Sequence, residues 1–518
     1  MSGFDQLMHW MNGIVWGPVM IVLLVGTGLY LTLRLRLAQV RYFGHSVRCI
    51  SGRFDRPEDA GEVTHFQALA AALSATIGTG NIAGVATAIA LGGPGAVFWM
   101  WVTALVGMAT KYTSCSLAVR HRVIDAEGRA AGGPMYFLSQ GLGQGWLGAL
   151  FAVFAGLASL GIGCAVQSNS VVDGLVRLLP AAWVGPSIPA AVPMIGGTVA
   201  LKVLAGLVLA VLVALVVIGG ITRIGKVAAR LVPFMCVFYI AGALVILLRN
   251  AGALPGAFAQ IFQYAFGPVA VGGGFVGVVI QQTIQKGVAR GVFSNESGLG
   301  SAPIAHAAAK TNEMAREGMV AMLGPFIDTI VVCSMTALVI IVTGAWQVHS
   351  DSGELLYGPG GQGVPVLVHV DGEGVRVVGH PGEDAEPFKD AEGDYYRVPT
   401  STSLTIAAFE AGLGPLGRWI VAVGIMLFAY STMISWSYYG ERCWFYLLGP
   451  RATTPYRVVF CVFIVVGTVS GLDLVWLVAD NLNALMAIPN LIGVIGLAGV
   501  VVKETKDYVG RMKAGGSW

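Results

Sequence analysis

Long apolar stretches dominate the chain and are separated by shorter polar segments. A transmembrane helix needs about 20 mainly apolar residues to cross the hydrocarbon core of a bilayer. By that measure we predict eleven transmembrane helices, near residues 13–33, 66–91, 95–119, 148–176, 195–219, 229–248, 268–290, 319–344, 415–440, 455–470 and 473–501. The pattern therefore predicts an all-α polytopic membrane protein, with residues 1–518 forming a single transmembrane domain.

The composition favours the same class. The chain is 55% hydrophobic and 11% charged, with a mean hydropathy of +0.73, whereas soluble proteins carry about 25% charged residues. The net charge of +3 is too small to indicate a nucleic-acid partner. The seven cysteines are scattered singly, which argues against a disulfide framework or a zinc site. The first twelve residues lack Lys and Arg, so we expect no cleavable signal peptide.

Basic residues predict the orientation, because they stay preferentially on the cytoplasmic side. With the N-terminus outside, most of the 31 Lys and Arg residues, Lys111 among them, fall on the cytoplasmic side. The long polar segment 345–403 is rich in acids and falls outside, and the C-terminus is cytoplasmic. Within this extracellular loop, the apolar runs Val366–Val370 and Val375–Val378 predict a β-hairpin.

Two predicted helices contain glycine-rich interruptions. In the second span, Gly78 and Gly80 flank Thr79 and are followed by Asn81. We predict that this helix breaks near Gly78–Asn81, although a continuous helix whose glycines pack against a neighbour is an alternative. The run Gly272–Gly277 in the seventh span has a comparable composition. Backbone exposed by such breaks is tolerated in a bilayer only where it faces protein, a cavity or a ligand.

The two interruptions occupy corresponding positions. The second span opens one group of five spans and the seventh opens the next, and an odd number of spans inverts the second group. We therefore predict a first repeat over 66–248 and an inverted second repeat over 268–501, with 13–33 as an extra N-terminal helix. Paired broken helices in two halves are typical of the binding site of a transporter.

Four motifs resemble a known family. They are Gly92–Gly107, Gly78–Asn81, Gly132–Tyr136 and Gly291–Pro303, and they resemble the alanine or glycine:cation symporter family over nearly the whole chain, the 345–403 loop excepted. The resemblance implies a leucine-transporter-like fold, with ten core helices in a 5+5 inverted repeat and one additional helix. It also implies coupling to sodium, less often to protons, and substrates of alanine or glycine size.

The predicted function is thus secondary active import of small neutral amino acids across the cell membrane, by alternating access. Sodium is the coupling ion, and we expect no cofactor. A proton-coupled symporter is the main alternative. A channel is less favoured, because inverted halves are typical of carriers. An enzyme is not expected, since the sequence has no HExxH or GxSxG pattern.

An amino-acid substrate needs donors for its carboxylate and acceptors for its ammonium. Unwound N–H groups of Thr79, Gly80 and Asn81 are the predicted donors, aided by the half-helix dipole. The Asn81 side chain either adds a donor or caps that half-helix. The predicted acceptors are the side-chain oxygen of Gln167 and the backbone carbonyls of Gly274 and Phe275. As an alternative, the Gln167 amide bonds a neighbouring helix.

Bulky side chains lining the pocket would limit the size of the substrate. Phe275, Val279 and Trp436 are predicted to close the pocket, with ordinary packing as the alternative for each of them.

Sodium prefers oxygen ligands. In the implied fold the ninth span faces the first broken helix, so we expect hydroxyls of Ser431 and Thr432 at a sodium site, or else back-bonded to their own helix. The remaining ligands would be carbonyl oxygens of Ser74, Ile77 and Phe428.

Two acids stand apart from these sets. Asp328 lies within the eighth span, where a carboxylate is either functional or bonds neighbouring helices. Glu296 resembles part of a cytoplasmic gate or cap.

Overall fold

The computed structural model describes residues 3–56, 58–124, 128–178, 197–266, 276–349, 355–357, 367–371, 374–379, 388–390, 393–397, 401–470 and 472–514. The first half of the chain contains the helices α1 (Gly3–Val15), α2 (Pro18–Arg34), α3 (Ala38–Arg41), α4 (Phe43–Ile50), α5 (His65–Thr76), α6 (Ala83–Gly92), α7 (Gly95–Arg120), α8 (Pro134–Tyr136), α9 (Gly145–Leu160), α10 (Val166–Leu178), α12 (Gly197–Val217) and α13 (Gly220–Arg249). The second half contains α14 (Leu254–Phe266), α15 (Val276–Asn295), α16 (Ala302–His306), α17 (Met314–Ala321), α18 (Leu323–Pro325), α19 (Ser334–Val342), α20 (Ser401–Leu413), α21 (Pro415–Leu448), α22 (Thr453–Val469), α23 (Leu472–Gly496) and α24 (Ala498–Lys513).

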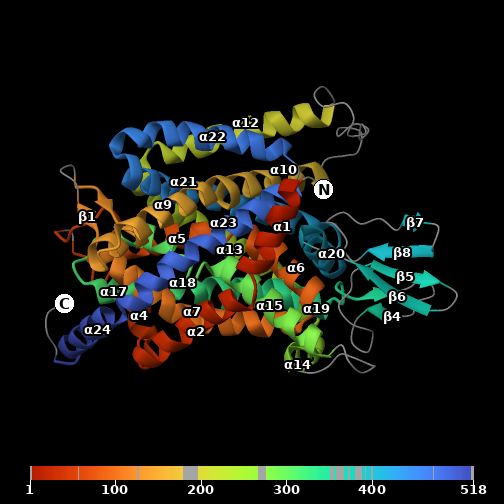
Figure 1. Cartoon of the computed structure of the whole chain (residues 1–518). Helices are drawn as coiled ribbons and strands as arrows, with labels where there is room; N and C mark the ends of the chain where they lie inside the picture. Colours follow the sequence, from red (N-terminus) through yellow and green to blue (C-terminus); the bar gives the residue numbers. More distant parts are fainter. Residues whose placement is uncertain are drawn as a thin grey trace.

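Most of these helices form one bundle (Figure 1). In the described part of the chain, seven helices are long and apolar enough to cross a membrane, and a bent pair makes an eighth. A multi-pass membrane protein is therefore confirmed, while the count of eleven spans stays a prediction. The predicted span 268–290 falls partly outside the described residues, and 95–119 corresponds to the long helix α7.

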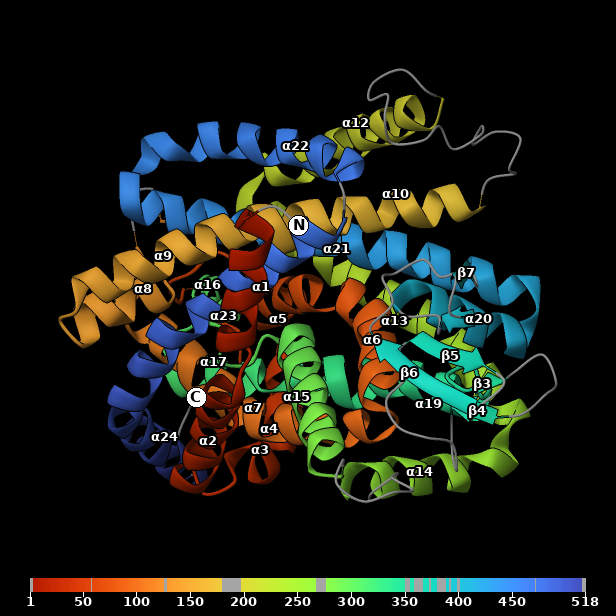
Figure 2. The same ribbon diagram turned by 45° about the vertical axis from the view of Figure 1, so that its right-hand side comes forward.

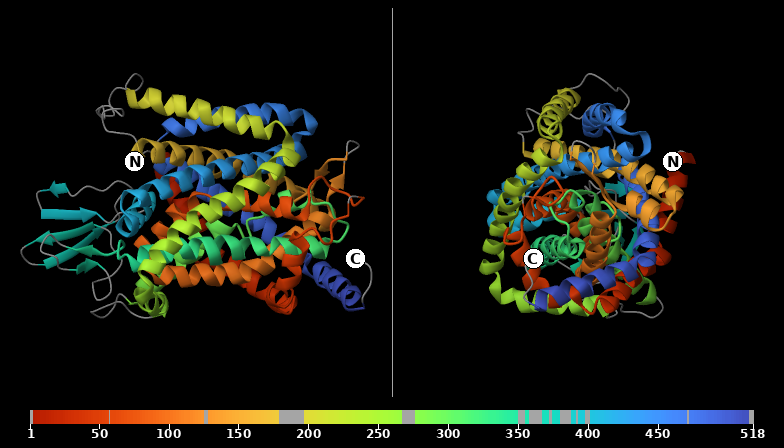
Figure 3. Two further views of the ribbon diagram at one scale, coloured as in Figure 1. Left: turned by 180° about the vertical axis from the view of Figure 1, so that it is seen from behind. Right: turned by 90° about the vertical axis from the view of Figure 1, so that its left-hand side faces the viewer.

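α12 and α22 run side by side along one edge of the molecule (Figure 2). The end-on view in Figure 3 shows this pair at the margin of the bundle. The helices nearer the centre approach one another closely through small residues. A Cβ on Gly287 of α15 would lie 2.5 Å from the carbonyl oxygen of Ala96 in α7. Glycine at this position therefore lets the two backbones pack closely, as membrane helices commonly do.

The first predicted break is confirmed. α5 begins with a capping box between Thr64 and Gln67 and ends at Thr76. A short 3-10 turn follows over Thr79–Asn81, and the helix direction changes by 63° before α6 continues. Gly78 sits at the break in an extended conformation. The residues of the break are all buried, so its free backbone groups face protein rather than lipid.

The second interruption that the structure describes lies in a different place from the one predicted. Of the run Gly272–Gly277, only the last two residues are described, and they begin α15. α15 is 20 residues long and ends at Asn295, and Glu296–Ser301 form a non-helical segment before α16. Glu296, Gly298 and Gly300 all have positive φ, which ends the helix and redirects the chain.

The loop 345–403 contains the predicted hairpin. β5 (Leu367–Asp371) pairs antiparallel with β6 (Gly374–Gly379). They belong to a four-stranded sheet in the order β6-β5-β8-β7, completed by β7 (Phe388–Asp390) and β8 (Gly393–Arg397). Two-stranded pairs are formed by β1 (Val123–Ile124) with β2 (Ala130–Ala131) and by β3 (Val348–His349) with β4 (Leu355–Tyr357). The sheet and the C-terminus lie at opposite ends of the molecule (Figure 1).

Candidate functional site

The first break packs directly against α21. The Ser74 hydroxyl donates to the carbonyl oxygen of Ser431 at 2.6 Å. The Ser431 hydroxyl in turn has three carbonyl oxygens within reach, those of Ser74 at 3.2 Å, Ile77 at 3.5 Å and Phe428 at 2.8 Å. The structure thus brings together four of the five residues predicted to hold sodium, and they are buried.

Thr432, the fifth of those residues, faces the same break one position further along α21. Its hydroxyl donates to the carbonyl oxygen of Phe428 at 3.0 Å, so the back-bonded arrangement is present for this residue and for Ser431. A Cβ on Gly78 would lie 2.5 Å from the Thr432 Oγ1. The close approach of α21 to the break therefore requires glycine at position 78.

Gln167 contributes a polar atom to the same place. Its Oε1 would lie 3.4 Å from a Cβ on Gly78, while its Nε2 donates to the carbonyl oxygen of Ile162 at 3.0 Å. Among the described residues, the buried oxygens Gln167 Oε1 and Thr79 Oγ1 have no hydrogen-bond partner. Buried polar atoms without partners are rare, and they indicate a site that a ligand or water completes.

The Asn81 side chain is occupied by protein contacts. Its Oδ1 accepts from the backbone N–H of Gly78 at 2.9 Å, which caps the break. Its Nδ2 donates to Asp328 Oδ1 at 2.6 Å. The capping alternative is therefore the arrangement that the structure contains. Gly80, which follows Thr79, packs against Phe293, whose ring would lie 3.2 Å from an added Cβ.

Asp328 connects the two breaks. Besides Asn81, its carboxylate accepts from the Ser294 hydroxyl at 2.8 Å and from the Thr329 hydroxyl at 2.7 Å. Ser294 lies in the last turn of α15, directly before the second break, and Asn81 lies in the first. A fully buried carboxylate is stable only when such donors surround it. This acid therefore joins the two interrupted helices to each other and to the α17–α19 segment.

Trp436 lies against the second break. Its indole N–H donates to Glu296 Oε1 at 3.0 Å, and the Ser301 hydroxyl donates to the other carboxylate oxygen. Trp436 also packs on Gly163, where an added Cβ would lie 2.3 Å from the Trp436 Cβ. Glu296 is buried at the start of the break, and its assignment to a cytoplasmic gate or cap stays a prediction.

Three predicted residues cannot be placed in this way. Gly274 and Phe275 lie outside the described residues, so the proposed ammonium acceptors and one wall of the pocket stay predictions. The backbone of Val279 belongs to α15, and its role as a wall of the pocket stays a prediction.

Lys111, counted among the basic residues on the cytoplasmic side, lies buried within α7, where its ammonium donates to the carbonyl oxygen of Asn295 at 2.9 Å. This contact ties α7 to the second break. A signal for that break was present in the sequence, because Gly298 and Gly300 repeat the spacing of Gly78 and Gly80 within the polar segment Ser294–Ser301.

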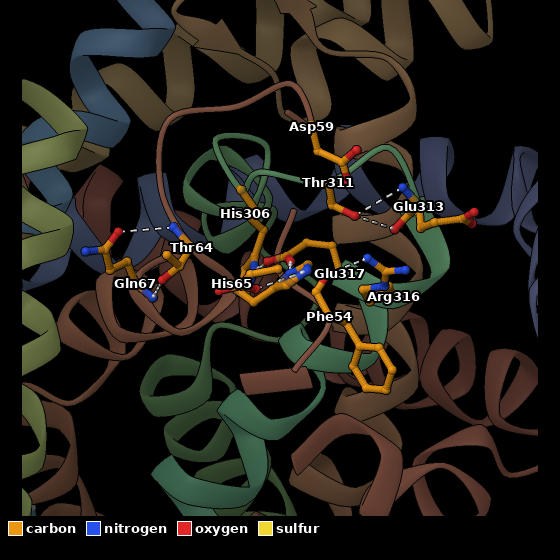
Figure 4. Close-up of polar contacts among 12 residues, drawn as sticks. Phe54, Asp59, Thr64, His65, Gln67, His306, Thr311, Glu313, Arg316 and Glu317 are labelled. Atoms are coloured by element: carbon orange, nitrogen blue, oxygen red, sulfur yellow. Dashed lines mark hydrogen bonds and ion pairs between the residues drawn. The ribbon is translucent and has the colours of Figure 1, made fainter. Parts of the chain in front are cut away.

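A second buried polar group joins the ends of the broken helices (Figure 4). His65, the first residue of α5, and His306, the last of α16, both point toward Glu317 of α17. The Nδ1 of His306 lies 2.6 Å from one carboxylate oxygen, and the Nδ1 of His65 contacts the other. All three side chains are fully buried. The sequence did not predict this group, since its members match no catalytic or metal-binding spacing.

The comparisons with known proteins agree on one family. The model of the sodium:alanine symporter family matches residues 1–357 and 392–517. The sodium/alanine symporter AgcS of Methanococcus maripaludis is 45% identical over 509 residues, which is 98% of this chain and 97% of that protein. The probable sodium/glutamine symporter GlnT of Bacillus subtilis is 34% identical, over 97% of this chain and 90% of that protein.

The fold has a counterpart among solved structures. The crystal structure of MhsT in complex with L-phenylalanine superimposes with a TM-score of 0.55 at 12% identity, covering 86% of this chain and 93% of MhsT. MhsT is a transporter of the leucine-transporter-like fold, so the likeness supports that fold here. The family model and the relatives describe transporters rather than enzymes. This chain belongs to the sodium:alanine symporter family and is a membrane transporter.

Proposed function

We propose that the protein imports small neutral amino acids, such as alanine and glycine, by coupling their movement to sodium through alternating access. The observation that carries the proposal is the junction of α5 and α21. There, oxygen atoms of Ser74, Ile77, Phe428, Ser431 and Thr432 gather beside a broken helix. The names of the relatives support the coupling ion and the amino-acid class.

The chemistry of the junction suits a hard cation. Hard cations prefer oxygen ligands, and unwound carbonyls at the C-terminal end of a half-helix are typical sodium ligands in carriers. Ser74 and Ile77 lie at that end of α5, where the helix dipole is negative. A sodium ion would thus hold α21 against the first break and favour the arrangement that binds the substrate.

The substrate would bind on the other side of the break. The N–H groups near Thr79 and Gly80 begin the 3-10 turn that precedes α6 and suit a carboxylate. Gln167 Oε1, which has no partner among the described residues, suits an ammonium. Gly274, Phe275, Val279 and Trp436 remain the proposed acceptors and walls that restrict the pocket to small side chains.

The two breaks are proposed to move together, because Asp328 bonds to both. The bundle that contains both breaks, one from the repeat 66–248 and one from the repeat 268–501, would rock against the rest of the protein, with 13–33 outside the repeats. Sodium and substrate would strengthen each other's binding reciprocally. With the N-terminus outside, the membrane potential adds about 2.3 kcal/mol per charge per 100 mV to import.

Uptake of labelled alanine into proteoliposomes tests the proposal. We expect saturable uptake that requires an inward sodium gradient. Uptake driven by a pH gradient in sodium-free buffer would instead establish the proton-coupled alternative. Flux that does not saturate with alanine would indicate a channel.

Replacing Thr432 by alanine should weaken sodium activation. The variant removes one oxygen from the junction, and we expect the sodium concentration for half-maximal uptake to rise about tenfold, or ~1.4 kcal/mol. The KM for alanine at saturating sodium should change far less. Ser437→Ala is the matched control, since that hydroxyl donates to the carbonyl oxygen of Ile434 in the same helix at 2.7 Å. An unchanged sodium response in Thr432→Ala would remove this residue from the site.

Replacing Gln167 by leucine should weaken substrate binding instead. The change keeps the bulk of the side chain but removes the oxygen beside Gly78, so we expect the KM for alanine to rise about tenfold with sodium activation retained. Ser170→Ala on the same helix is the control, because its hydroxyl donates to Val166 at 2.8 Å. Equal KM values for the two variants would assign Gln167 to helix packing.

A further inference from the structure

A polar cavity of about 470 Å³ lies between α13, α21 and α22, away from both breaks. Three arginines line it, Arg129, Arg442 and Arg457, together with two glutamates, Glu62 and Glu441. Its charged lining therefore has an excess of positive charge. The amino-acid site described above uses none of these residues.

Two of these arginines, Arg442 and Arg457, are held in fixed positions. Arg442 donates to Glu441 at 2.6 Å, and its guanidinium lies 5.3 Å from the ring centre of Tyr438 and 4.8 Å from that of Phe445. Arg457 donates through Nε to the other oxygen of Glu441 at 2.7 Å. Glu441 thus orients two guanidinium groups. Each guanidinium has five N–H donors, so a single carboxylate between them leaves donors for a further acceptor.

Two helices also begin at this cavity. Gly219, Gly220 and Thr222, at the start of α13, line it, as do Thr453 and Thr454 in the first turn of α22. α13 has no side-chain cap, so backbone N–H groups of its first turn lack the usual intrahelical partners. α22 continues directly from a 3-10 turn over Pro450–Ala452, so it offers the threonine hydroxyls to the cavity. Helix N-termini combined with arginines are typical of sites for phosphate groups.

A second, independent observation is that the Arg442 guanidinium is buried with one of its donors unpaired among the described residues. Its side chain is only 7% exposed, and its Nε has no hydrogen-bond partner in the described part of the chain. A buried charged donor without a partner is costly. The lining therefore lacks an acceptor that would complete it.

The surroundings place the cavity near the level of lipid headgroups. On the other side of the turn that joins α21 to α22 lies an apolar groove of about 430 Å³, lined by Trp444, Leu448, Tyr456 and Val459, with the exposed Arg451 among its residues. Aromatic and arginine side chains together mark the boundary between headgroups and acyl chains. Basic pockets between membrane helices are suited to anionic headgroups.

We propose that the cavity between α13, α21 and α22 binds a phosphate group, as carried by an anionic phospholipid or by free inorganic phosphate. The phosphate oxygens accept from Arg457, Arg442, the N–H groups of the first turn of α13 and the hydroxyls of Thr453 and Thr454. The site is separate from the amino-acid site, so its occupancy is measured without reference to transport.

Native mass spectrometry of the delipidated full-length protein tests this site, with phosphatidylglycerol, zwitterionic phosphatidylcholine and inorganic phosphate as separate probes. We expect retention of phosphatidylglycerol above phosphatidylcholine if a lipid supplies the group, and competition by inorganic phosphate if the free anion does. Absence of binding by all three probes overturns the proposal.

Variants locate the site. Arg457→Gln should weaken binding at least tenfold, whereas Arg451→Gln, the same change on the apolar side of the turn, should alter it less than twofold. Thr454→Glu places a carboxylate in the cavity without removing any existing ion pair, and it should also abolish binding. Unfolding temperatures of the unliganded variants confirm that each is folded. Equal loss in Arg451→Gln and Arg457→Gln would show general surface attraction and refute the cavity.

Discussion

Replacing Gly78 by alanine is expected to reduce sodium-dependent alanine uptake by at least tenfold. The added Cβ would lie 2.5 Å from the Thr432 hydroxyl oxygen and 3.4 Å from Gln167 Oε1. Thr432 is β-branched and sits in a buried part of α21, so its side chain has little freedom to move away. Overpacking of this kind costs about 1–3 kcal/mol, which is roughly 5- to 150-fold in an equilibrium constant.

The effect should come from contact rather than from backbone strain. Gly78 has φ −133° and ψ −152°, an extended conformation that alanine also adopts. Gly84 provides the matched control, because it lies six residues further along the same broken helix and an added Cβ meets nothing within 4 Å. Gly84→Ala should transport like the unmodified protein. Normal uptake by Gly78→Ala would mean that α21 does not approach the break during the transport cycle.

Replacing Glu317 by alanine is expected to destabilise the folded protein far more than the loss of an exposed carboxylate does. The variant would leave two fully buried histidines, His65 and His306, without the acceptor that they share. A buried donor or acceptor left without a partner costs about 1–3 kcal/mol, and the variant would leave one such nitrogen on each histidine. Because His65 begins α5 and His306 ends α16, the loss should also loosen both broken helices. Thermal unfolding of the purified protein, followed by tryptophan fluorescence, measures the effect as a lower melting temperature.

Two further variants separate charge from contact. Glu317→Gln should have an intermediate melting temperature. Its amide keeps both hydrogen bonds if one imidazole carries its proton on Nε2, so that Nδ1 of that ring accepts from the amide N–H. Glu410→Ala removes a partly exposed carboxylate that pairs with Arg418 at 2.7 Å. Such surface pairs contribute about 0–1 kcal/mol, so this control should melt almost normally. Equal melting temperatures for Glu317→Ala and Glu410→Ala would show that the histidines find other partners.

The sequence predicted features that depend on local composition. Long apolar stretches predicted a multi-pass helical membrane protein, because any such stretch must be removed from water wherever it lies in the chain. The break at Gly78–Asn81 was also predictable, since two glycines and an asparagine weaken a helix locally. The hairpin within 345–403 followed from its alternating apolar residues.

The second break that the structure describes was not predicted from local composition. Ser294–Ser301 is polar and resembled the loop after a span, while the predicted interruption at Gly272–Gly277 lies mostly outside the described residues and stays a prediction. The structure buries that polar segment, because Trp436, Lys111 and Asp328 supply partners for Glu296, Asn295 and Ser294. Burial of a polar segment depends on partners that are remote in sequence.

For the same reason, only part of the candidate site was predictable from the sequence. Residue types along the chain determined that Ser431 and Thr432 carry oxygens suited to a cation, and the family resemblance indicated which helix they face. Only the tertiary structure decided that the Asn81 side chain donates a hydrogen bond to Asp328, and that Glu317 contacts both His65 and His306. These residues are as many as 252 positions apart. Helix formation and breakage depend on neighbours within a few residues, whereas the pairing of buried polar groups depends on how whole helices pack.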